Sequence, residues 1–356
     1  MSDQASGTGK NLTLLAAVVV AIWGILGLRD QPNVPYAGYS TDGNNTVTKI
    51  YPSSPAEKAG LQVGDYITSI GGISVKDAKA IAHRPRAEIG EVRVIVVERR
   101  ADTQLAAAEA GPEVENIEVA YTQLSTRANS LGYASLLIGY FFLVFGVLPY
   151  MRRASRGALY LALVGVCLGL AFFAGPYFQS YALRATVNSL SIVLILFGFA
   201  FLLAFMLEFP KPKPILAKTG LARAIIYGPA AFLSLFIVYL IAAQPDATSG
   251  LNMLVNVLFG LFIVYYFGYA VVAMVNSYVK ATAAERDANG LNLMLAGVLV
   301  GLLPVTIASL IGIFAPAAVL PGSDFYFLTL ALIPISLYMA VMRVSSAPAA
   351  PTAEAV

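Results

Sequence analysis

Residues 47–75 read VTKIYPSSPAEKAGLQVGDYITSIGGISV, and this stretch decides how the rest of the chain is interpreted. Apolar and polar residues alternate from Val47 to Ile50 and again from Gly64 to Ile73, a pattern typical of half-buried strands. Between them, Ser54 and Pro55 predict the start of a short helix, because Ser caps a helix and Pro suits its first position. The stretch therefore predicts a small folded unit of strands and a short helix.

The remainder of the chain is strongly apolar. Of the 356 residues, 58% are hydrophobic and 12% are charged, and the mean hydropathy is +0.73; a soluble domain carries about 25% charged residues. The net charge of +3 gives no indication of nucleic-acid binding. The sequence holds one Cys and one His, which excludes a His/Cys metal cluster within one chain, and we expect no metal and no cofactor.

Eight apolar runs are long enough to span a bilayer, which takes about 17–25 residues. They cover residues 12–28, 130–151, 157–178, 186–207, 222–243, 251–279, 289–315 and 324–343. The sequence therefore predicts transmembrane helix 1, a polar insert, and a seven-helix transmembrane domain at 130–343. The first run could be a cleaved signal peptide, but its length and the lack of a small-x-small site before Arg29 favour an uncleaved anchor.

Lysine and arginine in the short loops predict the orientation of these helices. Every second connection is basic, and the basic residues concerned are Arg152, Arg153, Arg156, Lys211, Lys213, Lys218, Arg223, Lys280, Arg286 and Arg343. The connections between them hold only Arg184. The positive-inside rule then places both termini in the cytoplasm. The N-terminus comprises residues 1–11, and the C-terminus is an Ala/Pro-rich tail at 344–356 that we expect to be disordered. The insert would lie outside the bacterial inner membrane.

The insert, taken as a domain over 31–128, has a normal size for one domain with its own core. Short runs of Val and Ile alternate with polar residues, so it is β-rich. Gly71-Gly72 suits a tight turn with positive φ. Asp77 predicts a second short helix, which Pro85 should stop. The fold class predicted for the whole chain is a multi-pass α-helical membrane protein with an extracytoplasmic α+β domain.

Three pieces of the insert resemble the PDZ domain in its bacterial form. They are the strand from Val47 to Ile50, the helix start from Ser54 to Gly60, and the Gly-Asp pair with its following strand from Gly64 to Ile73. The resemblance covers about a quarter of the chain. PDZ domains bind the free C-terminal end of a peptide by adding it as an extra strand to a sheet edge.

The resemblance implies a groove between a strand and the second helix, with a loop before that strand offering N–H groups to the peptide carboxylate. By position, the loop residues are Tyr36, Ala37, Gly38 and Tyr39. Glycine suits such a loop because backbone without a Cβ can approach a ligand closely. The groove strand would follow at 39–41, and the residues lining the side-chain pocket would be Ala78, Ile81 and Ala82.

The insert also departs from the PDZ pattern. The segment after Tyr39 is polar and turn-rich, Pro85 cuts the second helix, and an Ala-rich stretch with Gly111-Pro112 adds a loop before the last strand. The alternative interpretation is therefore a PDZ fold kept as a spacer or docking surface, without peptide binding. His83 falls late in the helix, where we expect a solvated surface residue rather than one that selects a ligand.

PDZ domains also accompany intramembrane proteases, but the spans lack the residues for such chemistry. A zinc protease needs two histidines on a helix, a serine protease needs a Ser–His pair, and a two-aspartate protease needs two aspartates in its spans. The one histidine lies in the insert, and no span carries an ionisable group near its centre. Charges inside spans also mark ion and proton paths. We expect neither an enzyme nor an ion-coupled transporter.

Within the spans, the sequence predicts packing rather than chemistry. Gly165/Gly169 and Gly297/Gly301 are expected to let helices of this chain approach closely. Pro229, Pro304 and Pro334 fall inside spans and are expected to kink them. A Tyr-rich patch at 265–269 is expected to pack or anchor rather than form a pocket.

One anchor helix, a PDZ-like domain and seven further spans resemble the sensory half of membrane histidine kinases of the competence-pheromone-receptor type. Two further stretches are similar to that group, FPKPKP at 209–214 and IPISLYMAVMR at 333–343. The thirteen residues after Arg343 hold no phosphoacceptor histidine and no nucleotide-binding glycine motif, so we expect the sensory half without the kinase.

We therefore expect a receptor or sensor subunit that binds a peptide or protein C-terminus outside the membrane and signals through the helices to a separate cytoplasmic partner. The basic, proline-rich loop at 211–223 is the candidate contact for that partner or for anionic lipid, or else an ordinary positive-inside loop. A PDZ scaffold or envelope quality-control protein is the alternative function, and a transporter of an uncharged solute is the second alternative.

Overall fold

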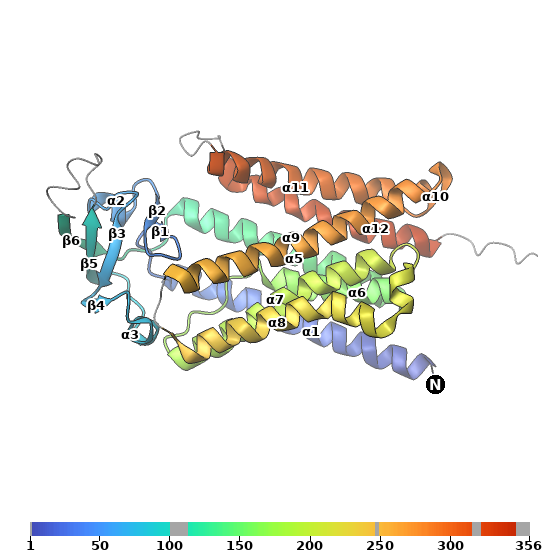
Figure 1. The fold of residues 1–356 in the computed structure, drawn as a ribbon, viewed down its shortest axis with the longest axis horizontal. Coiled ribbons are helices and arrows are strands. Elements are labelled where there is room, and N and C mark those ends of the chain that lie inside the picture. Colours follow the sequence, from blue (N-terminus) through green and yellow to red (C-terminus); the bar gives the residue numbers. More distant parts are fainter. Residues whose placement is uncertain (1, 100–112, 246–248, 315–321, 347–356) are drawn as a thin grey trace, which may run out of the picture.

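The computed structural model describes residues 2–99, 113–245, 249–314 and 322–346. A small β-rich domain lies at one end of a bundle of long helices (Figure 1). Helix α1 (Ser2–Asp30) and a short 3-10 helix, η1 (Gln31–Asn33), lead into this domain, and α5 (Thr126–Arg152) leads out of it. The insertion between the first and second long helices follows the prediction.

Within the described residues, the inserted domain contains two small sheets and two short α-helices. Strand β1 (Tyr39–Thr41) pairs antiparallel with β2 (Val47–Ile50). The second sheet has the order β4-β3-β5-β6, formed by β3 (Tyr66–Ile70), β4 (Ile73–Ser74), β5 (Val92–Arg99) and β6 (Glu113–Ala120). The helices are α2 (Pro55–Lys58) and α3 (Ala78–His83). Its core comprises Val47, Ala56, Leu61, Ile67, Val75, Ile95, Val97, Ile117 and Val119.

The local signals read from the sequence are confirmed in this domain. The Ser54 side chain accepts a hydrogen bond from the Glu57 N–H at the start of α2, and Asp77 accepts from the Ala80 N–H at the start of α3. Gly71 and Gly72, at φ of 59° and 78°, form the turn between β3 and β4. These features form locally because each depends on residues within a few positions of one another.

The bundle continues with α6 (Arg156–Leu170), α7 (Tyr181–Glu208), η2 (Pro214–Ala217), α8 (Thr219–Ala243), α9 (Ser249–Lys280), α10 (Ala283–Ala288), α11 (Leu291–Phe314), η3 (Ser323–Ala331) and α12 (Leu332–Ser346). Within the described ranges, seven helical segments are long and apolar enough to cross a membrane. Helix α6 has 15 residues and is shorter; at 1.5 Å per residue it covers about 22 Å of a hydrocarbon core about 30 Å thick. Helix length alone therefore does not establish eight spans.

The third predicted span, 157–178, is wrong in its C-terminal part, since α6 ends at Leu170. The chain then runs without helix to Ser180. The Ser135 hydroxyl of α5 donates a 2.8 Å hydrogen bond to the Phe172 carbonyl, which the ended helix leaves free. Non-helical backbone is tolerated at such a place when protein groups satisfy it.

Glycines of α1 and α5 make the room for this non-helical segment. A Cβ on Gly24 would lie 3.1 Å from the Phe173 ring, and one on Gly27 would lie 1.6 Å from the Ala174 carbonyl oxygen. A Cβ on Gly139 of α5 would also collide with the Phe173 ring, at 2.3 Å. The segment is therefore packed into a notch that only glycines leave open.

The two glycine pairs predicted to bring helices together do so within this chain. A Cβ on Gly165 would lie 2.5 Å from the Phe142 carbonyl oxygen of α5. A Cβ on Gly297 would lie 2.2 Å from the Ser336 Cβ of α12. The prediction of intramolecular packing at these pairs is confirmed.

The basic connections gather at the end of the bundle away from the β-rich domain (Figure 1). There Lys10 of α1 donates a hydrogen bond to the Met151 carbonyl at the end of α5, at 3.1 Å. Lys211 and Arg343 form ion pairs with Glu285 and Asp287 of α10. The N-terminus and the end of α12 also lie at this end.

Two predictions concern segments at the limits of the described chain. The disordered tail was expected from residue 344, but α12 continues to Ser346, and residues 347–356 lie outside the described residues. The extra loop expected before the last strand, with Gly111-Pro112, also lies outside them.

Candidate peptide-binding site

Strand β1 has an open edge. It pairs with β2 on one side, with Tyr39 opposite Ile50 and Ser40 opposite Lys49. No strand of the described chain pairs with its other side. An unpaired edge offers backbone donors and acceptors to an added strand. The groove strand expected at 39–41 is therefore present and free to pair.

The loop before β1 is held rigidly by the start of α2. Gly38 has φ of 84°, and a Cβ there would lie 2.1 Å from the Ser54 Cβ. The Ala37 carbonyl accepts a hydrogen bond from the Ala56 N–H at 2.9 Å. Position 38 therefore requires glycine because the start of α2 leaves no room for a Cβ. The sequence suggested a different reason, namely close approach of the backbone to a ligand.

The same loop keeps two backbone donors unused. Among the described residues, the N–H groups of Ala37 and Gly38 have no hydrogen-bond partner. Tyr36, in contrast, exchanges two backbone hydrogen bonds with Thr122 after β6. Free N–H groups in a fixed loop are what a carboxylate needs. The geometry of 36–39 fits the predicted carboxylate loop.

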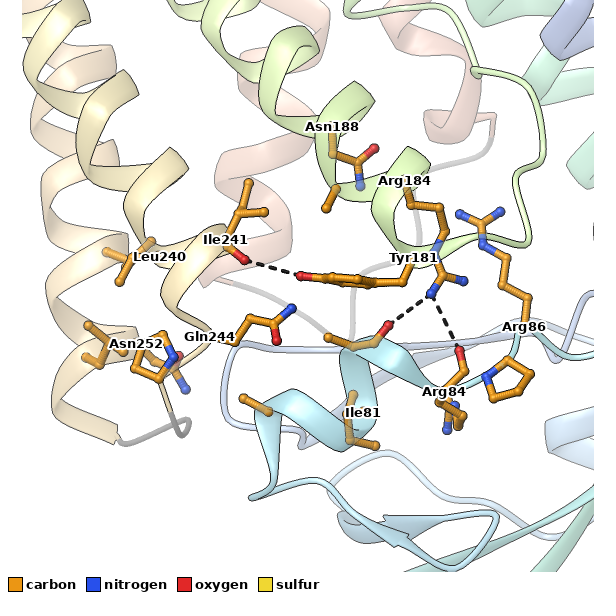
Figure 2. Close-up of a pocket in the computed structure, with 17 residues that line it drawn as sticks. Ile81, Arg84, Arg86, Tyr181, Arg184, Asn188, Leu240, Ile241, Gln244 and Asn252 are labelled. Atoms are coloured by element: carbon orange, nitrogen blue, oxygen red, sulfur yellow. Dashed lines mark hydrogen bonds between the residues drawn. The ribbon is translucent and has the colours of Figure 1, made fainter.

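The three predicted pocket residues of α3, Ala78, Ile81 and Ala82, lie on one wall of a cavity of about 580 Å³ (Figure 2). The opposite wall comes from the ends of α7, α8 and α9, with Tyr181, Arg184, Asn188, Leu240, Ile241, Gln244, Pro245, Leu251, Asn252 and Val255. The loop residues 36–39 do not line this cavity. The structure thus brings the predicted pocket residues of α3 against the bundle, whereas the predicted carboxylate loop at 36–39 lies outside that cavity.

Polar contacts join α3 to the first turn of α7. The Arg184 guanidinium donates hydrogen bonds to the carbonyls of Ala82 and Arg84, at 2.9 and 3.5 Å (Figure 2). The His83 ring lies 4.0 Å from the Tyr181 ring, centre to centre. His83 is exposed, as expected, but it is also a contact between the domain and the bundle.

Arg84, at the end of α3, places a positive charge near Tyr39. Burial and the neighbouring Arg93 lower the pKa of Arg84, whereas burial raises the pKa of Tyr39 and Arg84 acts against that rise. The Arg84 Nη1 atom is buried and has no hydrogen-bond partner in the described chain. A buried donor without a partner is costly, so this end of the groove favours an acceptor.

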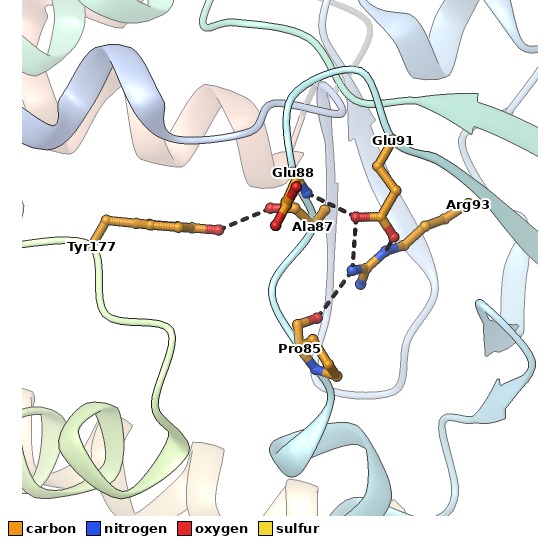
Figure 3. A network of polar contacts seen from close by, with 6 residues as sticks. All are labelled: Pro85, Ala87, Glu88, Glu91, Arg93 and Tyr177. Atoms are coloured by element: carbon orange, nitrogen blue, oxygen red, sulfur yellow. Dashed lines mark hydrogen bonds and ion pairs between the residues drawn. The ribbon is translucent and has the colours of Figure 1, made fainter.

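The loop between α3 and β5 is fixed by a small polar network (Figure 3). Arg93 donates to the Pro85 carbonyl at 3.1 Å and forms a 2.6 Å ion pair with Glu91. The hydrogen bond from Arg93 lowers the pKa of Glu91. From the bundle, the Tyr177 hydroxyl donates to the Ala87 carbonyl at 3.1 Å. These contacts fix the backbone of the loop, which carries Arg84 and Arg86.

Sequence reasoning did not find Arg84, Arg86, Tyr181 or Arg184. Arg184 lies about a hundred residues from α3 in sequence, and no local pattern connects them. One signal was available: Arg184 is the single basic residue in the short connections on its side of the bundle.

Comparison with known proteins supports the assignment of the domain. Residues 46–99 match the family model for the PDZ domain. A protein of Synechocystis sp. named "Putative serine protease HhoB" is 36% identical over 91 residues, 25% of this chain and 22% of that protein. The chain thus spans about a fifth of that relative's length. No solved structure matches the chain.

A PDZ domain is therefore present, inserted among helices long enough to cross a membrane. Ala78, Ile81 and Ala82 lie inside the matched residues, and the loop at 36–39 lies just before them. The peptide-binding role of these residues stays a prediction.

Proposed function

We propose that this protein is a membrane receptor or sensor subunit whose PDZ domain binds the C-terminus of a peptide or protein. One observation carries the proposal: α3, the helical wall of the groove, and the ends of α7, α8 and α9 line the same cavity. A ligand that contacts α3 there also contacts the bundle. Binding can then change the packing of the helices, which a separate partner reads at their far end.

The proposed location is a bacterial cytoplasmic membrane, crossed eight times, with the PDZ domain outside. The basic connections, the N-terminus and the end of α12 share the end of the bundle away from the domain. This distribution supports cytoplasmic termini under the positive-inside rule. The loop at 211–223 is the proposed contact for the cytoplasmic partner.

The proposal includes no enzymatic activity. The chain has one histidine, and its ring contacts the Tyr181 ring where the domain meets the bundle. The likeness to the protease-named relative is limited to a quarter of this chain. That likeness nevertheless favours one second candidate function, a scaffold in envelope quality control, which would bind its partners without a response in the bundle.

The test uses the full-length protein in lipid nanodiscs and matched peptides with free or amidated C-termini. Ala82→Trp should fill the cavity side of α3 and weaken binding of free-terminus peptides at least about tenfold. Lys79→Trp is the matched control, since Lys79 is exposed on α3 and does not line the cavity. Hydrogen exchange at the ends of α7–α9 separates a receptor, which responds to peptide, from a scaffold.

Equal binding of free and amidated peptides, or binding of neither, would contradict the proposal. Equal loss of affinity in both Trp variants would show that the cavity side of α3 is not the binding side.

A further inference from the structure

Two guanidinium groups stand together in the cavity between α3 and the bundle. Arg86 follows α3 in the chain and Arg184 lies in the first turn of α7, and both line the cavity (Figure 2). The Arg86 guanidinium lies 4.4 Å from the centre of the Tyr177 ring, which fixes its position. Arg184 is fixed by its hydrogen bond to the Ala82 carbonyl.

This pair has no counter-charge in the described chain. The residues that line the cavity include no carboxylate, and Arg86 and Arg184 form no ion pair among the described residues. Two acids of neighbouring segments are engaged elsewhere, Glu91 with Arg93 and Asp30 with the Tyr177 N–H. Burial and the charge of Arg184 lower the pKa of Arg86. Two partly buried like charges repel, and an anion between them would relieve the repulsion.

The surroundings of the pair indicate the kind of anion. Ala78 and Ala82 of α3 lie on the same wall, so a peptide that contacts these residues also reaches the cavity. The other lining residues are Arg84 and Tyr181, three amides, from Asn188, Gln244 and Asn252, and apolar chains, such as Leu240 and Ile241. A cavity of about 580 Å³ with this lining accommodates a side chain.

We infer that Arg86 and Arg184 bind an aspartate or glutamate side chain of the peptide held by the PDZ groove. The inference rests on the proposed function and adds the ligand class: peptides with a free C-terminus and an acidic residue upstream of it. Guanidinium groups suit this role because their planar N–H donors match a carboxylate.

The experiment compares two peptide libraries with free C-termini that differ only by Glu or Gln at the upstream positions. Full-length protein is used in zwitterionic nanodiscs, and affinity is measured by fluorescence anisotropy. The Glu library should contain peptides that bind about tenfold tighter than their Gln partners. In Arg86→Gln this difference should disappear, whereas in Lys79→Gln, which removes the same charge from the exposed side of α3, it should remain.

Each outcome decides the inference. If Arg86→Gln weakens Glu and Gln peptides equally, Arg86 is only structural and the inference is wrong. If Glu and Gln peptides bind the wild-type protein alike, the inference fails and the proposed function stands. If no free-terminus peptide binds, both fail. If the Glu preference is lost when anionic lipid is added to the nanodiscs at constant ionic strength, the arginine pair binds a lipid headgroup and the inference is overturned.

Discussion

Lys213 is a charged residue held partly inside the protein, at the end of the bundle away from the PDZ domain. Its ammonium group donates hydrogen bonds to the Met206 carbonyl, at 2.6 Å, and to the Ser277 hydroxyl, at 2.9 Å. The last carbonyls of a helix carry partial negative charge, so a cation suits the end of α7. Burial, with a smaller contribution from nearby Lys280, nevertheless lowers the pKa of Lys213 to about 8.

The lowered pKa predicts a pH dependence of stability. Below about pH 8 the folded and unfolded chains both carry the proton, and the folded state bears the full cost of the buried charge. Between about 8 and 10.5 the folded chain loses the proton first, so the free energy of unfolding should rise with pH. Because Lys213 is partly exposed, we expect a rise of about 1–2 kcal/mol.

Thermal unfolding in detergent, followed by circular dichroism between pH 7 and 10.5, measures this rise. Lys213→Met should remove it, and Lys218→Met, at an exposed position in the same loop, should keep it. A rise that is unchanged in Lys213→Met would show that another group causes it.

At the scale of elements, α8 keeps its helix across Pro229 with help from α9. Proline has no N–H, so the Ile225 carbonyl one turn earlier loses its helical donor. The Tyr265 hydroxyl donates to this carbonyl at 2.9 Å. The Tyr266 hydroxyl accepts from the Ala230 N–H and donates to the Ile226 carbonyl, at 3.1 and 2.7 Å. The packing role predicted for the Tyr-rich patch is confirmed, with hydrogen bonding added.

We expect Tyr265→Phe to destabilise the protein by about 1 kcal/mol, because the Ile225 carbonyl is left without a donor. In a Pro229→Ala background the backbone supplies that donor, and the cost should largely disappear. Cys167 is buried in α6, so its reaction with a thiol-specific dye reports unfolding. Tyr269→Phe, which removes a hydroxyl that bonds to neither carbonyl, is the control. Equal costs with and without Pro229 would contradict the explanation.

Glycines act at the same scale by setting how closely elements approach. The α5–α6 contact depends on Gly165, and the non-helical segment after α6 depends on Gly24 and Gly27. The role of Gly165 was visible in the sequence as part of a Gly-xxx-Gly pair. The roles of Gly24 and Gly27 were not visible, because the segment that packs against them lies far away along the chain.

At the scale of the whole molecule, the PDZ domain is docked on the bundle at several separate points. Arg184 and Tyr177 hold the segment from 82 to 87. On the other side of the cavity, the Asn252 side chain of α9 donates to the Gly43 carbonyl in the β1–β2 turn. Contacts on both sides of the cavity fix the domain relative to the helices.

This docking predicts an efficient cross-link between Gly43→Cys and Asn252→Cys. A Cβ built on Gly43 lies 3.8 Å from the Asn252 Cβ, and disulfides need about 3.5–4.5 Å. In a Cys167→Ala background, mild oxidation in membranes should form the bond, detected by gel mobility. Gly43→Cys with Met253→Cys is the matched control, since the next residue on a helix points about 100° away. Equal cross-linking of both pairs would indicate a loosely tethered domain.

Much of the fold could be predicted because its signals are local. Ser54 and Asp77 cap helices, and Gly71-Gly72 forms a turn, through bonds to residues a few positions away. Apolar runs in the sequence predicted the positions of the long helices. Alternation of apolar and polar residues predicted the strands that form the core of the PDZ domain. The third span was predicted too long because its hydropathy continues past Leu170, while packing against α1 and α5 ends the helix there.

By itself, the sequence determined the PDZ domain, the apolar helices and the candidate groove residues, since these follow from short-range chemistry and periodicity. Only the tertiary structure decided that α3 shares a cavity with α7–α9 and that Arg86 meets Arg184 there. Those groups are distant in sequence and carry no common pattern. Their proximity arises because the PDZ domain docks on the helix bundle, and this docking depends on how the two surfaces fit.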